Sequence, residues 1–460
     1  MDPVITLNDI AQELKGAVCQ RQKRYRFGNV VIDSRMVKKN DVFVAIEGNT
    51  QDGHKYISQA IKNGACAVIV SQKRKYPKDI WVIRVHDTTR ALGEVSALYR
   101  QHFNIPVVAI TGSCGKTTTK DILSAVLQRK FKVLKNKKSE NNQWGVPLTL
   151  FKLKKSHQVA VLELGTNQRG DIRGLTKIAK PTIAIFTNIG FSHLQGLKNE
   201  KGVFKEKLDL IRFMESNGCV IFNADDLHLS QISSKRLKHK KISYGSSSKS
   251  DVSVKDIQTK GRAAVGFNVL GEKYRLNSGA RHNVINSLAV ISCAKVLGVG
   301  YHEIYQGLLR FKFDNQRCQT VSCHGFLVID DTYNSNPPSF CSALELLSKI
   351  IVKGKKILIC ADMLELGARA ERFHKQMAVP IIESGVDCLL TYGSLSSSIT
   401  ETIHTRKRVG SVLAQHMTSF KSIEQWLKKN IKKGDVVLVK GSRAMKMETI
   451  VSFLKSHKIN

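Results

Sequence analysis

The sequence predicts an α/β protein with three domains: a small N-terminal α/β domain, a central, mostly parallel α/β domain with a phosphate-binding loop (P-loop), and a C-terminal Rossmann-like domain. At about 150 residues per domain, its 460 residues correspond to about three domains. Apolar strands alternate with helical segments, which is typical of parallel sheets covered on both faces. With 42% hydrophobic and 24% charged residues, the chain is neither disordered nor fibrous. We place the domains at residues 1–103, 104–313 and 314–460.

The first domain combines short strands with two helices. Runs of β-branched residues bounded by turn residues predict strands at residues 30–32, 42–46 and 67–70. Helical periodicity predicts a helix over residues 56–63, and Asp87 begins a second one that continues to Tyr99.

The central domain opens with an apolar strand at residues 106–110, followed by a Gly-rich turn and a helix over 118–128. Glycine and serine turns punctuate residues 243–276, which predicts an antiparallel insertion or edge. The remaining central strands are expected at residues 159–162, 183–186 and 219–222.

The third domain again alternates strands with helices, which predicts a Rossmann-like sheet. Its strands are expected at residues 326–329, 356–360, 388–391 and 435–439, and its helices at 339–349 and 422–430.

Charge and cysteine content narrow the class of protein. There are 73 Lys and Arg against 37 Asp and Glu, a net charge of +36. A solvated basic surface that attracts anions is favoured, and nucleic-acid binding stays open as the alternative. The ten cysteines are scattered without a CxxC pair, which suits reduced thiols. Because we find no signal-peptide pattern and no run of ~18 apolar residues, we expect a cytoplasmic protein without membrane insertion.

The strongest motif is Ile-Thr-Gly-Ser-Cys-Gly-Lys-Thr-Thr at residues 110–118, between an apolar strand and a helix. Backbone N–H groups at a helix N-terminus cradle anions. Lys116 can reach terminal phosphates, and the Thr117 hydroxyl can bind Mg²⁺. Ile110 stands where the strict P-loop pattern has Gly, so a tight turn without a ligand is the weaker alternative.

Two further side chains are expected at the same edge of the sheet. Glu163 follows the strand at 159–162, and His193 follows the strand at 183–186. Parallel α/β sheets bind ligands at the carboxyl ends of their strands, so we favour a metal or phosphate role for both. A hydrogen-bonded loop residue is the alternative for His193.

Together with further blocks along nearly the whole chain, these residues resemble the Mur ligase family. The matching blocks are Asp33-Ser34-Arg35, Asp52-Gly53-His54, the loop at 111–117, Asn141-Asn142, Glu163-Leu164-Gly165, Thr187-Asn188 with His193, Asn283 to Asn286, Asp330 to Pro337, Asp362 to Gly367 and Lys440 to Arg443. The last two of these blocks, Asp362 to Gly367 and Lys440 to Arg443, select the branch that adds a dipeptide.

The resemblance implies an ATP-dependent ligase of cytoplasmic peptidoglycan precursor synthesis. It would join D-alanyl-D-alanine to UDP-N-acetylmuramoyl (UDP-MurNAc)-tripeptide through an acyl phosphate, releasing ADP and phosphate. ATP and the carboxylate that it phosphorylates are both anions, so catalysis is mainly positioning and charge neutralisation. Lysine and diaminopimelate both stay open as the third residue of the tripeptide. We expect a monomer that does not bind nucleic acid.

The resemblance also implies roles for residues. Those expected at ATP are Gly112, Ser113, Cys114, Gly115, Lys116, Thr117, Thr118, Asn283, Arg317 and Asp331. Two Mg²⁺ ions would lie near Thr117, Glu163, His193 and a carbamoylated Lys207. Lys116, Glu163, His193 and Lys207 are the implied catalytic residues, and Ser34, Arg35, Asn142, Asn334 and Asn336 the implied substrate ligands. The alternatives are a solvated helix lysine for Lys207 and a polar turn with an internal salt bridge for Asp33-Ser34-Arg35.

Two departures and three rival functions remain. Ala280 and Ala361 replace glycines that are usual in the family, and a Cβ at Ala280 is expected to crowd a tight turn on the adenine side. The rivals are a Mur ligase that adds the third, diamino acid residue, a folylpolyglutamate synthase, and a basic P-loop ATPase that binds nucleic acid. The first usually carries an Asp-Asn-Pro-Arg block, which this chain lacks.

Overall fold

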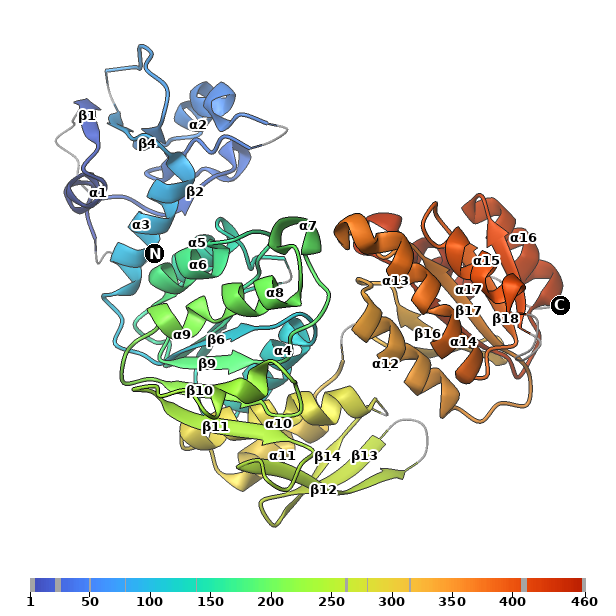
Figure 1. Cartoon of the computed structure of the whole chain (residues 1–460). Helices are drawn as coiled ribbons and strands as arrows, with labels where there is room; N and C mark the ends of the chain where they lie inside the picture. The colour runs from blue at the N-terminus through green and yellow to red at the C-terminus, as the bar shows by residue number, and fades with distance from the viewer. Residues whose placement is uncertain are drawn as a thin grey trace.

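The computed structural model describes residues 5–20, 26–48, 51–78, 80–137, 139–260, 264–278, 280–313, 316–406 and 412–456. They form three sheets that follow one another along the chain, each with its own helices (Figure 1). This arrangement confirms the predicted α/β class. The domain boundaries stay predictions, and the one at residue 314 lies outside the described residues.

The N-terminal sheet has the strand order β1-β5-β4-β3-β2. Adjacent strands in this sheet run parallel, except β1 and β5, which pair antiparallel. Asp87 caps α3, because its carboxylate accepts from the backbone N–H groups of Thr89 and Arg90. The elements are α1 (Leu7–Leu14), β1 (Ala17–Gln20), β2 (Val30–Val31), η1 (Ser34–Met36), β3 (Val42–Val44), η2 (Gly53–Tyr56), α2 (Ile57–Lys62), β4 (Ala67–Val70), β5 (Trp81–Arg84) and α3 (Thr88–Arg100).

The central sheet has the strand order β14-β13-β12-β11-β10-β9-β6-β8-β7. The strands from β7 to β11 pair in parallel, whereas β12, β13 and β14 form an antiparallel edge, as predicted for residues 243–276. The strands are β6 (Val107–Thr111), β7 (Val133–Lys135), β8 (Val159–Glu163), β9 (Ile183–Phe186), β10 (Cys219–Asn223), β11 (Lys240–Gly245), β12 (Val252–Lys260), β13 (Ala264–Val269) and β14 (Glu272–Leu276).

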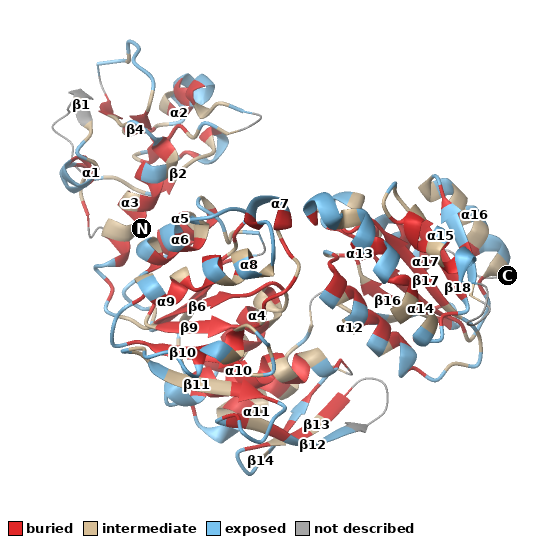
Figure 2. Cartoon of the chain, viewed as in Figure 1, coloured by how far each residue is buried: buried red, intermediate tan, exposed pale blue. Residues whose placement is uncertain are grey.

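Helices cover both faces of this sheet, so its middle strands are buried (Figure 2). On one side α4 packs against α10 and α11, and on the other α6 packs against α3 and α9. The helix predicted from residue 118 begins two residues earlier, at Lys116. The helical elements are α4 (Lys116–Leu127), α5 (Gly145–Leu150), α6 (Asp171–Ala179), α7 (Leu194–Leu197), α8 (Glu200–Lys207), α9 (Asp209–Phe213), η3 (Leu229–Ile232), α10 (Arg281–Val296) and α11 (Tyr301–Arg310).

The third sheet has the strand order β15-β16-β20-β17-β18-β19, parallel except for the pair β15 and β16. Its register sets Asp331 at the end of β16 opposite Lys440 at the end of β20. The elements are β15 (Gln319–Cys323), β16 (Phe326–Asp331), α12 (Pro337–Ser348), β17 (Lys356–Ala361), η4 (Gly367–Arg369), α13 (Ala370–Gln376), α14 (Ala378–Glu383), β18 (Cys388–Tyr392), α15 (Ser397–Thr405), β19 (Leu413–Met417), α16 (Phe420–Asn430), β20 (Val436–Lys440), η5 (Arg443–Met445) and α17 (Glu448–Ser456).

The third unit meets the central one where α7 lies against η4, beside α13 (Figure 1). Among the described residues, no helix combines the length and the apolar character needed to cross a bilayer.

Candidate active site

The P-loop between β6 and α4 depends on two glycines. Gly112 has φ +154°, and a Cβ there would lie 1.9 Å from Oγ1 of Thr187. Gly115 has φ +80°, a left-handed conformation that favours glycine, and it ends the loop directly before α4. The Lys116 ammonium donates to the carbonyl of Gly112 at 2.7 Å. The sequence therefore builds the turn locally, as the motif predicted.

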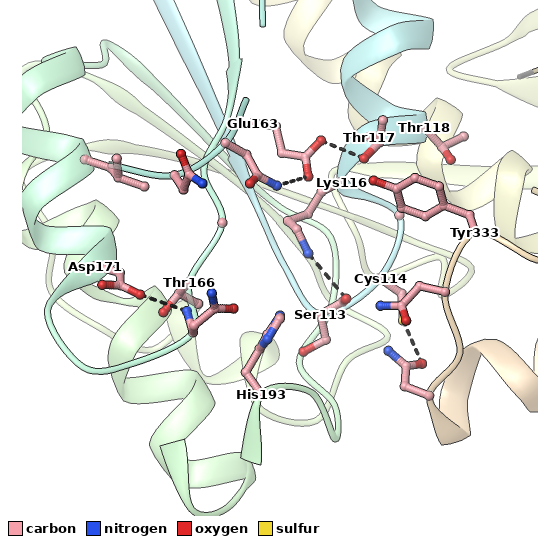
Figure 3. Close-up of a pocket in the computed structure, with 18 of the residues that line it drawn as sticks. Ser113, Cys114, Lys116, Thr117, Thr118, Glu163, Thr166, Asp171, His193 and Tyr333 are labelled. Atoms are coloured by element: carbon pink, nitrogen blue, oxygen red, sulfur yellow. Dashed lines mark hydrogen bonds between the residues drawn. The ribbon is translucent and has the colours of Figure 1, made fainter. Parts of the chain in front are cut away.

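Glu163 lies at the end of β8, next to this loop (Figure 3). The Thr117 hydroxyl donates to its Oε2 at 2.6 Å, and the Asn141 amide donates to its Oε1 at 2.8 Å. Burial alone would raise the pKa of Glu163, but Lys116, Lys120 and these hydrogen bonds outweigh burial and lower it. Glu163 is therefore a buried carboxylate beside the P-loop.

His193 enters the same cavity from the start of α7. Its backbone has φ +53°, and its Nδ1 lies 2.9 Å from Oε2 of Glu365 in the third unit. In Figure 3 the imidazole points toward Ser113 and Lys116. The pairing of Glu163 and His193 at one sheet edge is thus present.

Lys207, at the end of α8, is buried, with 1% of its surface exposed. Burial, and then the nearby charge of Lys116, hold the pKa of the Lys207 amine well below its ordinary value of 10.5. The alternative of a solvated helix lysine is therefore wrong. Lys207 is not among the residues that line the cavity.

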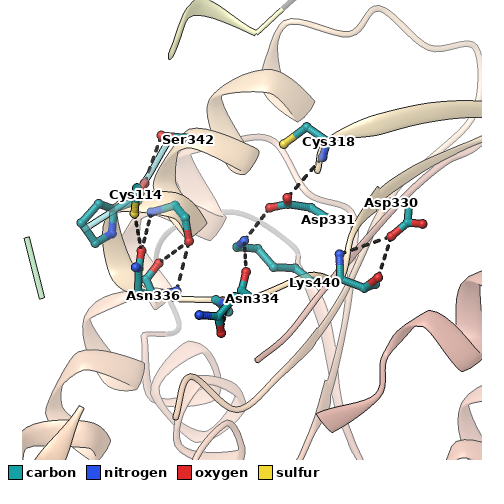
Figure 4. A network of polar contacts seen from close by, with 12 residues as sticks. Cys114, Cys318, Asp330, Asp331, Asn334, Asn336, Ser342 and Lys440 are labelled. Atoms are coloured by element: carbon teal, nitrogen blue, oxygen red, sulfur yellow. Dashed lines mark hydrogen bonds and ion pairs between the residues drawn. The ribbon is translucent and has the colours of Figure 1, made fainter. Parts of the chain in front are cut away.

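The third unit contributes a cation and an anion (Figure 4). The Lys440 ammonium donates to the Asp331 carboxylate at 2.5 Å and to the Asn334 carbonyl at 3.2 Å. The Arg317 guanidinium stacks over the Tyr333 ring, 3.9 Å from its centroid. Nε and Nη2 of Arg317 are buried and have no hydrogen-bond partner among the described residues, which suits an anionic ligand.

Asn336 links the third unit to the P-loop. Its Oδ1 accepts from the Ser339 backbone and caps α12, and it also accepts from the Cys114 thiol at 3.2 Å. The side chain predicted for the incoming substrate therefore lies directly beside the phosphate loop.

One cavity of about 1320 Å³ is shared by the three units. The N-terminal unit contributes residues of α3 and its cap, including Asp87, Thr89 and Arg90. The predicted site residues that line the cavity are Ser113, Cys114, Gly115, Lys116, Thr117, Thr118, Asn142, Glu163, His193, Asn283, Arg317, Asp331, Asn334 and Asn336.

Four predicted residues do not line the cavity: Gly112, Lys207, Ser34 and Arg35. Gly112 is a P-loop residue whose Cα lies against Thr187. Ser34 donates to Gln59 at 2.7 Å and is buried, and Arg35 pairs with Asp33 at 2.7 Å and is 79% exposed. The internal salt bridge of the alternative interpretation is thus present in this turn.

Two of the predicted residues that line the cavity, Asn142 and Asn283, are held by local contacts. Oδ1 of Asn142 accepts from the backbone N–H of Gly145, the first residue of α5, at 2.9 Å, and Asn283 donates to Oγ of Ser278 at 2.8 Å. Ala280 precedes α10 with φ −85°, an ordinary conformation for a residue with a Cβ. The backbone at Ala280 therefore does not require glycine, and the crowding expected from its Cβ stays a prediction.

The sequence analysis gave no role to four residues that the structure places at or beside the site: Lys120, Asn141, Glu365 and Lys440, although the last three stand in blocks that carry the family resemblance. Lys120 is buried, and its Nζ lies 3.9 Å from Oε2 of Glu163. A lysine that ends an apolar strand, as Lys440 does, is a signal that the strand-end rule would have found. For Glu365 the sequence gives no signal of a contact with His193, because only the tertiary fold brings the two side chains together.

The oxygen donors suit magnesium. No group of three or more His, Cys, Asp or Glu side chains that could hold a metal occurs within the described part of the chain. Mg²⁺ is usually held by one or two carboxylates together with substrate phosphates and water. The hydroxyl of Thr117 and the carboxylate of Glu163, next to a phosphate loop, match that donor set.

Comparisons with protein families cover most of the chain. The Mur ligase family catalytic domain matches residues 26–109, the Mur ligase middle domain residues 110–294, and the Mur ligase glutamate ligase domain residues 316–443.

Individual relatives agree with these matches. The chain is 33% identical to the UDP-N-acetylmuramoyl-tripeptide–D-alanyl-D-alanine ligase of Bacillus subtilis over 98% of each chain, and 30% identical to that of Escherichia coli over 93% of this chain and 94% of the other.

Solved structures support the same grouping. MurF from Acinetobacter baumannii superposes with a TM-score of 0.90 at 28% identity, covering 99% of this chain and 100% of the other. MurF ligase from Thermotoga maritima in complex with ADP gives 0.83 at 27% identity, with coverages of 93% and 97%. From the P-loop to the third sheet, both sequence and structure place the chain in the Mur ligase family, which was predicted from its motifs, and the chain belongs to that family.

Proposed function

We propose that the chain is an ATP-dependent ligase that joins D-alanyl-D-alanine to UDP-MurNAc-tripeptide in peptidoglycan precursor synthesis. The observation that carries the proposal is the shared cavity. In it, the P-loop faces Asp331, Asn334 and Asn336 of the third unit. The relatives with this enzyme's name match nearly the whole chain at about 30% identity.

The reaction needs an activated carboxyl group, because a carboxylate is a poor electrophile. The backbone of the P-loop and Lys116 hold the ATP phosphates, and the γ-phosphoryl group passes to the free carboxylate of the tripeptide. The dipeptide amine then attacks the carbonyl of the acyl phosphate. A tetrahedral intermediate forms, the C–O bond to phosphate breaks, and the amine loses a proton as the peptide bond forms. Positioning and neutralisation of charge supply most of the rate.

Magnesium would be held by Thr117 and Glu163, and a second ion by His193 and a carbamoylated Lys207. Bound there, the ions would neutralise the negative charge of the phosphates. Thr117 and Glu163 are already joined by a hydrogen bond of 2.6 Å.

Carbamoylation of Lys207 is supported by its lowered pKa, which favours the neutral amine. A neutral amine attacks CO₂, forms an N–C bond and releases one proton, which leaves an anionic carbamate. The product replaces a cation by oxygen ligands, which Mg²⁺ prefers.

The remaining site residues are assigned to individual substrates. Arg317 and Asp331 are proposed for the ATP ribose and phosphates, Asn142 for the UDP-sugar peptide, and Asn334 and Asn336 for the dipeptide. Ser34 and Arg35 are proposed for the uridine diphosphate. Arg35 supports this assignment, because its guanidinium is exposed and suits phosphate. We further propose a cytoplasmic monomer.

The test is phosphate release against a matrix of UDP-MurNAc-peptides and amine acceptors. We expect release to require UDP-MurNAc-tripeptide and D-alanyl-D-alanine together. A Mur ligase that adds the third, diamino acid residue would instead release phosphate with UDP-MurNAc-dipeptide and a diamino acid. A nucleic-acid ATPase predicts stimulation by polynucleotide that falls steeply with salt.

A further inference from the structure

The loop that follows β17, residues 362–367, is fixed to the third unit by buried polar contacts. Oδ1 of Asp362 accepts from the backbone of Ser396 at 2.8 Å. The backbone N–H of Met363 donates to Nε2 of the buried His374 at 2.9 Å, and that of Leu364 donates to Oγ of Ser442 at 2.8 Å. Glu365 is therefore presented by a rigid loop.

This loop reaches the central unit at the start of α7. Oε2 of Glu365 lies 2.9 Å from Nδ1 of His193, and the Glu365 carbonyl accepts from the backbone N–H of Leu194 at 3.0 Å. Beside them the rings of Phe191 and Phe373 pack with centroids 4.5 Å apart. The side chain and the backbone of Glu365 thus hold two consecutive residues of the central unit.

The contact selects one form of the imidazole. A carboxylate can only accept hydrogen bonds, so Nδ1 of His193 must carry the proton. In the neutral ring this leaves the lone pair on Nε2. Histidines that bind metals usually donate their other N–H to a carboxylate, which fixes both tautomer and ring orientation.

We propose that Glu365 is a positioning residue, which orients the imidazole of His193 toward a divalent cation in the nucleotide cavity while the third unit is docked. This inference rests on the function proposed above. It follows that docking of the third unit completes the cation site, because the carboxylate comes from one unit and the imidazole from the other.

The geometry argues against a role of Glu365 in docking alone. Its side chain is 55% exposed, and exposed ion pairs contribute little to stability. The aromatic contact of Phe191 with Phe373 and the bond from Cys114 to Asn336 also join the two units. Removing the carboxylate is therefore expected to leave the units docked.

The experiment compares Glu365→Ala, Glu365→Gln and the matched control Glu371→Gln in the full-length chain. Glu371 lies on α13, is exposed and pairs with Lys375 on the same helix. Three quantities are measured: the affinity for Mn²⁺ in the presence of ATP, by electron paramagnetic resonance; the protonated ring nitrogen of His193, by ¹⁵N NMR assigned with His193→Gln; and the overall dimensions, by small-angle scattering.

We expect Glu365→Ala to weaken Mn²⁺ binding at least ~10-fold and to remove the preference for a proton on Nδ1. Glu365→Gln, whose amide oxygen still accepts a hydrogen bond, is expected to be intermediate, and Glu371→Gln to match the unaltered chain. In a His193→Gln background, Glu365→Ala is expected to have no further effect on Mn²⁺ binding.

Unchanged Mn²⁺ affinity in Glu365→Ala would overturn the inference. So would weaker Mn²⁺ binding with an unchanged proton position and altered dimensions, because that result describes docking alone. If the unaltered chain itself failed to bind Mn²⁺ with ATP and showed no ligase turnover, the proposed function would fail rather than the role of Glu365.

Discussion

Glu163 forms a buried pair with Lys120, and variants of this pair can separate the contribution of Glu163 to protein stability from its contribution to catalysis. Lys120 is 1% exposed and Glu163 5% exposed, and Nζ of the lysine lies 3.9 Å from Oε2 of the glutamate. At an effective dielectric constant near 20, two unit charges at this distance attract by about 4 kcal/mol. The perturbations are Glu163→Gln, Lys120→Met and the double variant.

We expect a coupling free energy of about 2–4 kcal/mol between the two substitutions. Glu163→Gln removes one of the two carboxylates near the buried Lys120 ammonium and leaves Oδ1 of Asp121 at 3.8 Å, so the buried lysine loses part of its charge compensation, which is costly. The double variant removes both charges, so it is expected to be more stable than the sum of the two single effects predicts.

The assay is urea unfolding followed by tryptophan fluorescence. The chain has three tryptophans, and Trp144 is the one in the central unit. All variants are therefore compared in a Trp81→Phe, Trp426→Phe background, so that the signal reports the central unit. A coupling free energy below about 0.5 kcal/mol would refute the reasoning.

Phosphate release is measured on the same proteins. The double variant still lacks the carboxylate that accepts the hydrogen bond of Thr117, so we expect its magnesium-dependent rate to stay at least ~10²-fold below that of the starting protein. Restored turnover would show that Glu163 serves the fold and not the chemistry.

Four further predictions follow from the site. Lys116→Ala should abolish turnover while calorimetry still detects binding of the UDP-sugar peptide; normal turnover would contradict the role of Lys116. Lys207→Ala should regain part of its activity with added formate or acetate, and no recovery would leave the carbamate unsupported. Gly112→Ala should lose the rise in Tm that MgATP produces, because the new Cβ would lie 1.9 Å from Oγ1 of Thr187; Gly170→Ala, which also has a positive φ (+91°) but whose Cβ would meet no atom within 4 Å, should keep it. The lowered pKa of Glu163 contributes stability that is complete above its ordinary value of 4.5 and is lost as the pH falls through the lower folded value, so acid should destabilise the starting protein more than Glu163→Gln in urea unfolding.

The elements with strong local signals were predicted close to their observed bounds. The helix capped by Asp87 and the strand before the P-loop are examples. The strands β1 and β5 were not predicted, because each has four residues and little periodicity; β5 forms between β4 and β1, and β1 forms at the edge of the sheet by pairing with β5. Short strands of this kind depend on tertiary neighbours more than on their own sequence.

The same division holds in the site. The P-loop was predictable because its chemistry lies in consecutive residues, and Glu163 because strand ends share an edge. The burial of Lys207 could not be predicted, since a lysine in Phe-Lys-Glu-Lys-Leu looks like a solvated helix residue. The turn at Ser34 and Arg35 was recognised, but its place outside the cavity depends on how the N-terminal unit sits.

The sequence by itself determined the three α/β units, the P-loop and the family, because each strand, each helix and each family motif is encoded by residues near one another in the chain. Tertiary structure decided which distant side chains form ion pairs or hydrogen bonds: Lys120 with Glu163, Lys440 with Asp331 and Glu365 with His193. Electrostatic and hydrogen-bonding interactions act over a few ångströms of space, and separation along the chain carries no record of those distances.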